Sequence, residues 1–404
     1  MPRSRTLATA LLAATLGSSV LVAYAQTPQP YIPGPDHCLL VKNPDARKTC
    51  QLARTEYYKS HYTGALALIN KAIAISPGEG ALHVVQASIS GRFEAFGPAE
   101  QQLRLARKDG APDHIVLPQL FNVMTRRHEE NILLNEFPEP ASDAKGEVAS
   151  DILQGRAVAL LALNQTQAAA AAMDRSLFLY RDADGLLARA DIALKQNDSA
   201  LADKLVDEAY RLDPKSPSVM VAKIKRLERG RDNAGVLAVS DQMIALYPIF
   251  SDSVAAKVRV FLKLNQDAKA HAVLDAYSKI RPKSAVIGYY KAVLLSRAKD
   301  KMGAAQRLQA LPLQFSRDNP DYALQMAQIA LDNGNVENAA SILGAALGGA
   351  PDRVDLRLKL AEIRASQGDA HSALQILNPV NDSKDPGVQT LRKKIQAQIA
   401  RDRL

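Results

Sequence analysis

Apolar residues recur at every third or fourth position through most of the chain, in stretches of about a dozen residues separated by short polar turns. Residues 186–194 form one such stretch, and a polar turn at residues 195–198 follows it. Ala202, Leu205 and Ala209 mark the apolar side of the next stretch. This spacing is typical of amphipathic α-helices. The pattern predicts an all-α protein built from pairs of helices joined by tight turns.

The helix pairs repeat at a fixed period. Proline follows an apolar stretch at positions that agree in phase to within one residue, Pro77, Pro214, Pro248, Pro282 and Pro351. The spacing is 34 residues from Pro214 to Pro248 and again from Pro248 to Pro282. Because proline lacks an N–H and clashes with the preceding turn, each of these residues is expected to end a second helix. Pro118, by contrast, lies near the start of a first helix, where it is tolerated only in the first turn.

Small residues occupy the positions where paired helices approach most closely. They are Ala53, Ala87, Ala157, Ala190, Ala292, Ala327 and Ala361 on first helices, and Ala65, Ala99, Ala169, Ala202, Ala270, Ala304, Ala339 and Ala373 on second helices. A 34-residue helix–turn–helix with this pattern resembles the tetratricopeptide repeat. The resemblance implies a right-handed α-solenoid of about ten repeats over residues 46–386. Repeats three and four, at residues 113–182, carry a longer connector at residues 137–142.

The two ends of the chain have a different character. Residues 1–25 have the three parts of a signal peptide: Arg3 and Arg5, an apolar stretch, and small residues before Gln26. We therefore expect export to the periplasm, cleavage before Gln26 and no later transmembrane segment. The alternatives are an uncleaved membrane anchor and secretion from the cell. A proline-rich lead-in is predicted at residues 26–45. Residues 387–404 carry a single apolar stripe among basic residues and are predicted to form a capping helix over the end of the solenoid; a basic amphipathic membrane helix is the alternative.

Cysteine usage and charge narrow the possible functions. Two cysteines exclude a dense disulfide scaffold, and after export Cys38 and Cys50 are expected to pair; two free thiols are the alternative. Lys and Arg number 51 against 42 Asp and Glu, a net charge of +9. This excess is small for 404 residues and is not gathered in a long basic run. We interpret it as a mildly basic surface and expect no nucleic-acid partner.

Catalytic signatures are absent from the sequence. The seven histidines form no His-Glu-x-x-His motif, and the chain has no Gly-x-Ser-x-Gly elbow, phosphate-binding loop or dinucleotide fingerprint. We therefore predict that the protein is not an enzyme and that it needs no cofactor and no metal.

The resemblance places the ninth and thirteenth positions of each repeat on the concave face of the solenoid. In the middle repeats these positions carry mostly cations, Lys195, Lys225, Arg229, Arg259, Lys263 and Arg297, which are expected to point to solvent. They suggest a groove for an anionic ligand. The alternative is a solvated face whose charges nearby acids such as Glu228 and Asp252 neutralise.

Three further stretches, at residues 153–164, 251–266 and 288–295, resemble the repeat lipoproteins that accompany exosortase sorting systems and exopolysaccharide loci. Those proteins are longer and carry a lipid-anchoring Cys that this chain lacks. The resemblance implies an exported scaffold that binds protein or peptide partners in the cell envelope, in exopolysaccharide export or secretion. Direct binding of an anionic polysaccharide or peptide in the basic groove is the alternative.

Overall fold

The structure, a computed structural model, describes residues 36–59, 61–381 and 385–402. These residues form 22 α-helices and two short 3₁₀ helices, and no strand occurs among them. Contacts divide the chain into an N-terminal unit, Met1–Asp213, and a C-terminal unit, Pro214–Leu404. The predicted signal peptide at residues 1–25 lies outside the described residues, as does the predicted lead-in up to residue 35.

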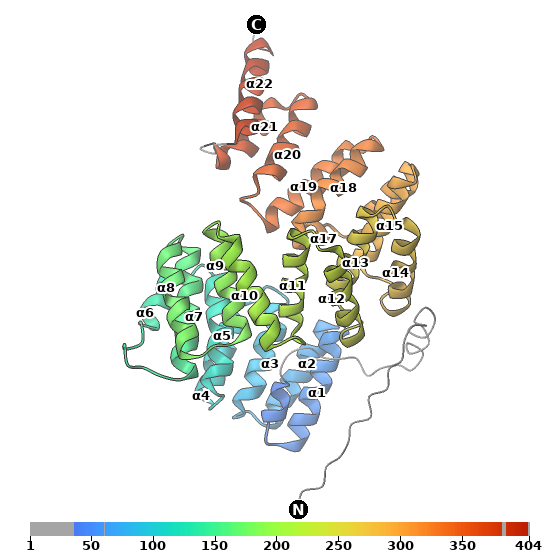
Figure 1. Cartoon of the computed structure of the whole chain (residues 1–404). Helices are drawn as coiled ribbons and strands as arrows, with labels where there is room; N and C mark the ends of the chain where they lie inside the picture. The colour runs from blue at the N-terminus through green and yellow to red at the C-terminus, as the bar shows by residue number, and fades with distance from the viewer. Residues whose placement is uncertain (1–35, 60, 382–384, 403–404) are drawn as a thin grey trace, which may run out of the picture. The chain divides into compact units, whose positions relative to one another are not determined.

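The N-terminal unit is a run of five helix pairs, in which each odd-numbered helix packs against the even-numbered helix that follows it (Figure 1). The helices are α1 (Pro44–Tyr58), α2 (Tyr62–Ile75), α3 (Gly80–Gly91), α4 (Phe96–Lys108), α5 (Asp113–Arg126), α6 (Glu130–Glu136), α7 (Glu147–Ala162), α8 (Thr166–Leu179), α9 (Ala183–Lys195) and α10 (Ser199–Leu212).

The C-terminal unit holds five more pairs, α11 with α12, α13 with α14, α15 with α16, α18 with α19 and α20 with α21. Its helices are α11 (Pro217–Arg229), α12 (Asn233–Leu246), α13 (Ser251–Lys263), α14 (Asp267–Ile280), α15 (Ala285–Arg297), α16 (Lys301–Gln309), α17 (Leu313–Asp318), α18 (Pro320–Asp332), α19 (Val336–Gly349), α20 (Val354–Ser366), α21 (Ala370–Leu377) and α22 (Pro386–Asp402). The ten pairs in the described part of the chain confirm the predicted all-α array of about ten repeats. The solenoid predicted over residues 46–386 includes residues of both units, whose contacts divide at Asp213 and Pro214.

The turn inside a pair has a recurrent conformation in nine of the ten pairs, from the pair α3 and α4 onward. A residue with positive φ follows the first helix, for example Asn197 at 61° and Asn265 at 55°. Asparagine tolerates this left-handed region better than most residues do. In several pairs an aspartate then caps the second helix. The Asp198 carboxylate accepts from the Leu201 N–H at 2.9 Å, and Asp232 accepts from the Gly235 N–H at 2.8 Å. A tight turn therefore satisfies backbone donors that a helix start leaves without partners.

The repeat pattern agrees with the helix boundaries and the core. Pro77, Pro214, Pro248, Pro282 and Pro351 each lie two residues after the end of a second helix. All fifteen alanines predicted at close-contact positions are buried, with Ala202 and Ala270 fully inaccessible. Any larger side chain at these positions would push the paired helices apart.

Two repeats depart from the expected form at prolines. Pro118 was expected near the start of its helix, where proline is tolerated only in the first turn; α5 begins at Asp113, so Pro118 lies in the second turn. In repeat eight, α16 ends at Gln309, and Pro312 is the N-cap of the extra helix α17. Since proline cannot continue a helix, the second helix of this repeat is split into two short segments.

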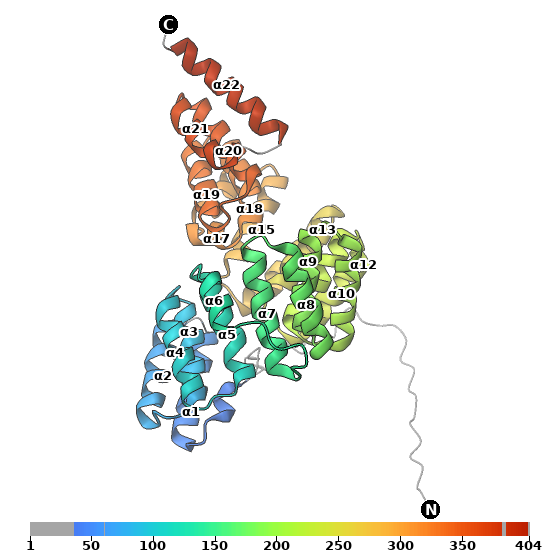
Figure 2. The ribbon, with the colours of Figure 1, turned by 90° about the vertical axis from the view of Figure 1, so that its left-hand side faces the viewer.

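The last helix covers the end of the C-terminal unit, as predicted. Val388 and Ile395 of α22 are buried, and α22 packs against α20 and α21 (Figure 2). The helix runs from Pro386 to Asp402, close to the predicted residues 387–404. No helix in the described part of the chain is long and apolar enough to cross a bilayer.

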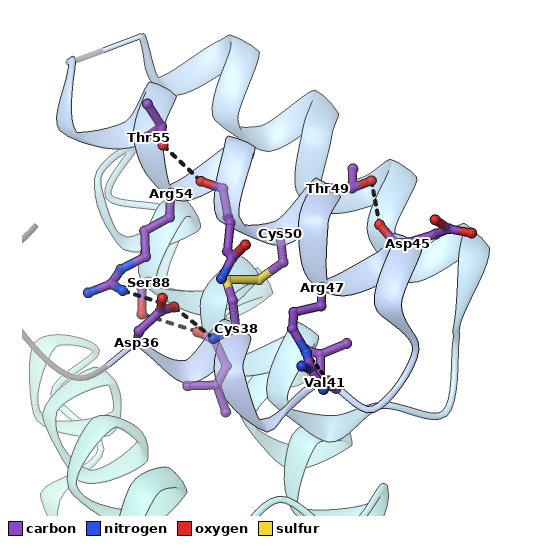
Figure 3. The surroundings of a disulfide bond; sticks show 12 residues. Asp36, Cys38, Val41, Asp45, Arg47, Thr49, Cys50, Arg54, Thr55 and Ser88 are labelled. Carbon is purple, nitrogen blue, oxygen red and sulfur yellow. Dashed lines mark hydrogen bonds and ion pairs between the residues drawn. A yellow bond between two sulfur atoms is a disulfide. The ribbon is translucent and has the colours of Figure 1, made fainter. Parts of the chain in front are cut away.

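A disulfide joins Cys38 to Cys50, with 5.7 Å between the two Cα atoms (Figure 3). It ties a short 3₁₀ helix, His37–Leu40, to the middle of α1. The Arg54 guanidinium lies 2.8 Å from the Asp36 carboxylate and fixes the same segment to α1. The residues before the first repeat are thus held to it covalently and by an ion pair.

Candidate partner-binding surface

The predicted cations of the C-terminal unit lie on successive first helices. Lys225 and Arg229 belong to α11, Arg259 and Lys263 to α13, and Arg297 to α15. We call the surface formed by these five residues the basic face. Lys195 is the last residue of α9 and belongs to the N-terminal unit, where it is exposed.

Two cations at the thirteenth repeat position reach back to the repeat before them. The Lys263 ammonium lies 3.3 Å from the side-chain oxygen of Asn233, at the start of α12. The Arg297 guanidinium lies 3.0 Å from Asp267 and 2.9 Å from the side-chain oxygen of Asn265. Lys263 thus meets a neutral amide and its charge is not compensated there, whereas the charge of Arg297 is paired with a carboxylate.

Arg259 does not have the solvent-facing role expected for it. Its Nε donates to the Glu228 carboxylate at 2.9 Å, and its Nη1 donates to the hydroxyls of Tyr290 at 3.1 Å and Tyr322 at 3.3 Å. Only 38% of the side chain is exposed. These three hydrogen-bond partners lie on α11, α15 and α18. Arg259 therefore links helices and does not present a free charge.

The tyrosines around Arg259 form an aromatic cluster that sequence reasoning missed. The rings of Tyr289 and Tyr322 stack with centroids 4.5 Å apart, and Phe315 of α17 lies 5.9 Å from Tyr322. Burial, and after it the neighbouring Tyr322, raises the pKa values of Tyr289 and Tyr290 above the ordinary value for tyrosine. The cluster could have been suspected from two adjacent tyrosines, Tyr289 and Tyr290, which lie in the middle of a predicted first helix.

The exposed charge of the basic face therefore lies on α11 and α13. Lys225, Arg229 and Lys263 are exposed. Lys225 has no ion-pair partner among the described residues. Glu228, one of the two acids expected to neutralise the face, pairs with Arg259. Lys225 on α11 and Lys263 on α13 thus carry positive charge that no described acid compensates, whereas the charge of Arg297 on α15 is paired with Asp267.

The described residues offer no grouping of three or more His, Cys, Asp or Glu that could hold a metal ion. The groups that this surface presents to solvent are the exposed cations on successive first helices, since the hydroxyls of Tyr289 and Tyr290 are buried. Such a surface can attract an anionic partner.

Family models identify the repeats. Models of the tetratricopeptide repeat match residues 155–217 and 330–395. The chain is a tetratricopeptide repeat protein. Repeats of this family generally mediate protein–protein interactions. The match at residues 155–217 includes α8, α9 and α10. The match at residues 330–395 includes α19, α20 and α21 and reaches into the capping helix α22.

Solved structures with a similar arrangement of helices include yeast Tom70, at 12% identity and a TM-score of 0.49, with 89% of each chain covered. A tetratricopeptide repeat protein from Parabacteroides merdae is 13% identical, with a TM-score of 0.35, 66% of this chain and 92% of that chain covered. PilF of Pseudomonas aeruginosa is 17% identical, with a TM-score of 0.34, 52% of this chain and 94% of that chain covered. No curated protein sequence matches this tetratricopeptide repeat protein.

Proposed function

We propose that this tetratricopeptide repeat protein is an exported, non-enzymatic scaffold of the bacterial envelope, which binds a protein partner through the basic face. The observation that carries the proposal is the exposure of Lys225, Arg229 and Lys263 on neighbouring first helices of a repeat array. Three cations on one rigid surface attract an acidic segment of a partner and give the interaction its salt dependence.

The envelope location is supported by two features of the chain. The first 25 residues have the pattern of a signal peptide. The Cys38–Cys50 disulfide suits an oxidising compartment such as the periplasm. Fractionation of cells tests this part: we expect a periplasmic chain that begins at Gln26. Recovery of residues 1–25 on membrane-bound protein would contradict it.

Exopolysaccharide export or secretion is the process that we propose for the scaffold. Its support is the resemblance of residues 153–164, 251–266 and 288–295 to repeat proteins of exopolysaccharide loci. A neighbouring polysaccharide operon would favour this process, and genes of an unrelated pathway beside the chain's own gene would count against it.

Binding through the basic face is tested with a charge-removal variant. We expect Lys225→Gln/Arg229→Gln/Lys263→Gln to capture its partner from periplasmic extract about tenfold less well, with a flatter salt dependence. The matched control is Lys279→Gln/Lys301→Gln/Arg307→Gln, which removes the same charge from exposed positions on second helices of the same unit. Equal capture by both variants would contradict the proposal. Capture of a glycan in place of a protein would favour direct polysaccharide binding.

A further inference from the structure

The N-terminal unit contains a hollow of about 470 Å³ beside the connector between α6 and α7. It is lined by Arg107 at the end of α4, by Glu136 at the end of α6, by residues 137–140 and Lys145 of the connector, and by Val148, Ala149 and Ile152 at the start of α7. Its volume is within the range of sites that take small ligands or single side chains. No residue of the basic face lines it.

Two arginines hold the wall of this hollow in place. The Arg156 guanidinium donates to the backbone carbonyls of Leu134 at 2.9 Å and Phe137 at 2.7 Å. The Arg175 guanidinium donates to the Pro140 carbonyl at 2.8 Å and to the Glu139 carboxylate at 2.7 Å. The backbone of the long connector is therefore fixed by helices α7 and α8, and the hollow is a built part of the repeat.

The floor of the hollow is apolar and partly open to solvent. Val148 is 41% exposed and Ile152 is half-buried, both on α7. Phe137 is buried beneath the Arg107 guanidinium, which lies 5.8 Å from the centre of its ring. An apolar side chain that covers Val148 and Ile152 would be stabilised by the area it removes from water.

Most of the charged side chains around this floor are paired with a side chain of opposite charge, and one is not. The Glu136 carboxylate is held by both terminal nitrogens of Arg104, at 2.7 and 2.8 Å. Glu139 is paired with Arg175, as described above, and the Arg107 guanidinium lies 2.8 Å from Asp113. Lys145 is exposed and, within the described part of the chain, is the lining charge without an ion-pair partner. The rim therefore favours an added anion over an added cation.

We propose that this hollow binds an extended segment of a partner polypeptide in which an apolar side chain stands next to an Asp or Glu. The apolar side chain lies over Val148 and Ile152, and the carboxylate lies beside Lys145. The site adds a second contact to the proposed scaffold function, in a different unit from the basic face. Either contact can fail without the other, because they share no residue.

Two short blocked peptides test the site on the full-length protein, one with a Leu-Glu centre and one with Leu-Gln, each flanked by glycine. By titration calorimetry we expect the Leu-Glu peptide to bind with a Kd of about 1 mM. The Leu-Gln peptide should bind about two- to fivefold more weakly. Lys145→Gln should abolish that difference, whereas Lys71→Gln, an exposed lysine on α2, should preserve it.

The apolar floor is tested by a matched pair of valines. Val148→Gln should weaken both peptides, and Val158→Gln should not, because Val158 is also 41% exposed on α7 but does not line the hollow. The triple Gln variant of the basic face should bind both peptides as the wild type does. Absence of binding at about 10 mM, equal affinity for the two peptides, or loss of binding in that triple variant would each overturn the proposal.

Discussion

The guanidinium of Arg259 on α13 lies 3.3 Å from the hydroxyl of Tyr322 on α18, 63 residues later in the chain. The same nitrogen donates to Tyr290 on α15 at 3.1 Å. In most solenoids a repeat contacts only its immediate neighbours. Here one side chain connects first helices of repeats seven, eight and nine, and so couples repeats that are not adjacent in sequence.

We expect Arg259→Gln to lower the free energy of unfolding by about 1–3 kcal/mol, because it leaves Glu228 and two tyrosine hydroxyls short of a donor. Urea unfolding followed by circular dichroism measures this. Arg307→Gln, at an exposed position on α16, should change stability by less than about 0.5 kcal/mol. Equal midpoints for the two variants would show that the link carries no stability.

Close packing inside a repeat is tested at Ala202. This residue of α10 is fully buried, so Ala202→Leu should force strain of about 1–3 kcal/mol between α9 and α10. Lys204→Ala, on the exposed side of the same helix, serves as the control. Thermal unfolding should separate the two variants. Equal melting temperatures would contradict the assignment of Ala202 to the contact between paired helices.

Asp151 on α7 is buried, and its Oδ2 atom has no hydrogen-bond partner among the described residues. Burial raises the pKa of Asp151 to about 7, and the nearby acids Glu147, Asp182 and Asp113 add to the effect. The native carboxyl thus keeps a proton that the unfolded chain loses near pH 4. The stability that this proton contributes is present below about pH 4 and is lost as the pH rises through about 7.

Asp151→Asn should therefore stabilise the protein at pH 8, by about 1–3 kcal/mol, and leave it nearly unchanged at pH 4. The measurement is the difference in urea midpoint between wild type and variant at the two pH values. Asp143→Asn, at an exposed position in the connector, should show no such difference. An equal gain from Asp151→Asn at both pH values would rule out ionisation of Asp151 as the cause.

The disulfide between Cys38 and Cys50 closes a loop of 12 residues. Replacing both cysteines with serine should cost about 3 kcal/mol, mostly through the greater freedom of the unfolded chain. Thiol labelling of unreduced, unfolded protein should attach no label. Two labels per chain would show that the bridge does not form.

The sequence predicted the parts of the fold that local rules determine. The helix ends just before Pro214 and Pro248, and buried alanines such as Ala202 and Ala270, follow from helix geometry and the 34-residue period. It did not show the division at Asp213, because contacts between successive repeats leave no local signature in the sequence.

Side-chain links between repeats were harder to predict. Arg259 was expected to point to solvent, since its tyrosine partners lie 31 and 63 residues away and no short motif joins them. One recurring ion pair could have been predicted from the sequence.

Lys257 pairs with Asp241, and Lys291 pairs with Asp275 at 2.8 Å. In both pairs the lysine follows the aspartate by 16 residues, and the two pairs lie one repeat apart. The connector hollow depends on Arg156 and Arg175, which lie on the helices that follow it.

The central claim is that a protein partner binds on the basic face. The most direct test is photocrosslinking at single positions in the producing cell. A benzophenone amino acid would replace Lys225 or Lys263 on first helices, and Lys279 or Lys301 on second helices as controls. We predict a protease-sensitive adduct from Lys225 and Lys263 and none from the two controls. Adducts of equal yield from all four positions, or from the second helices alone, would contradict the claim.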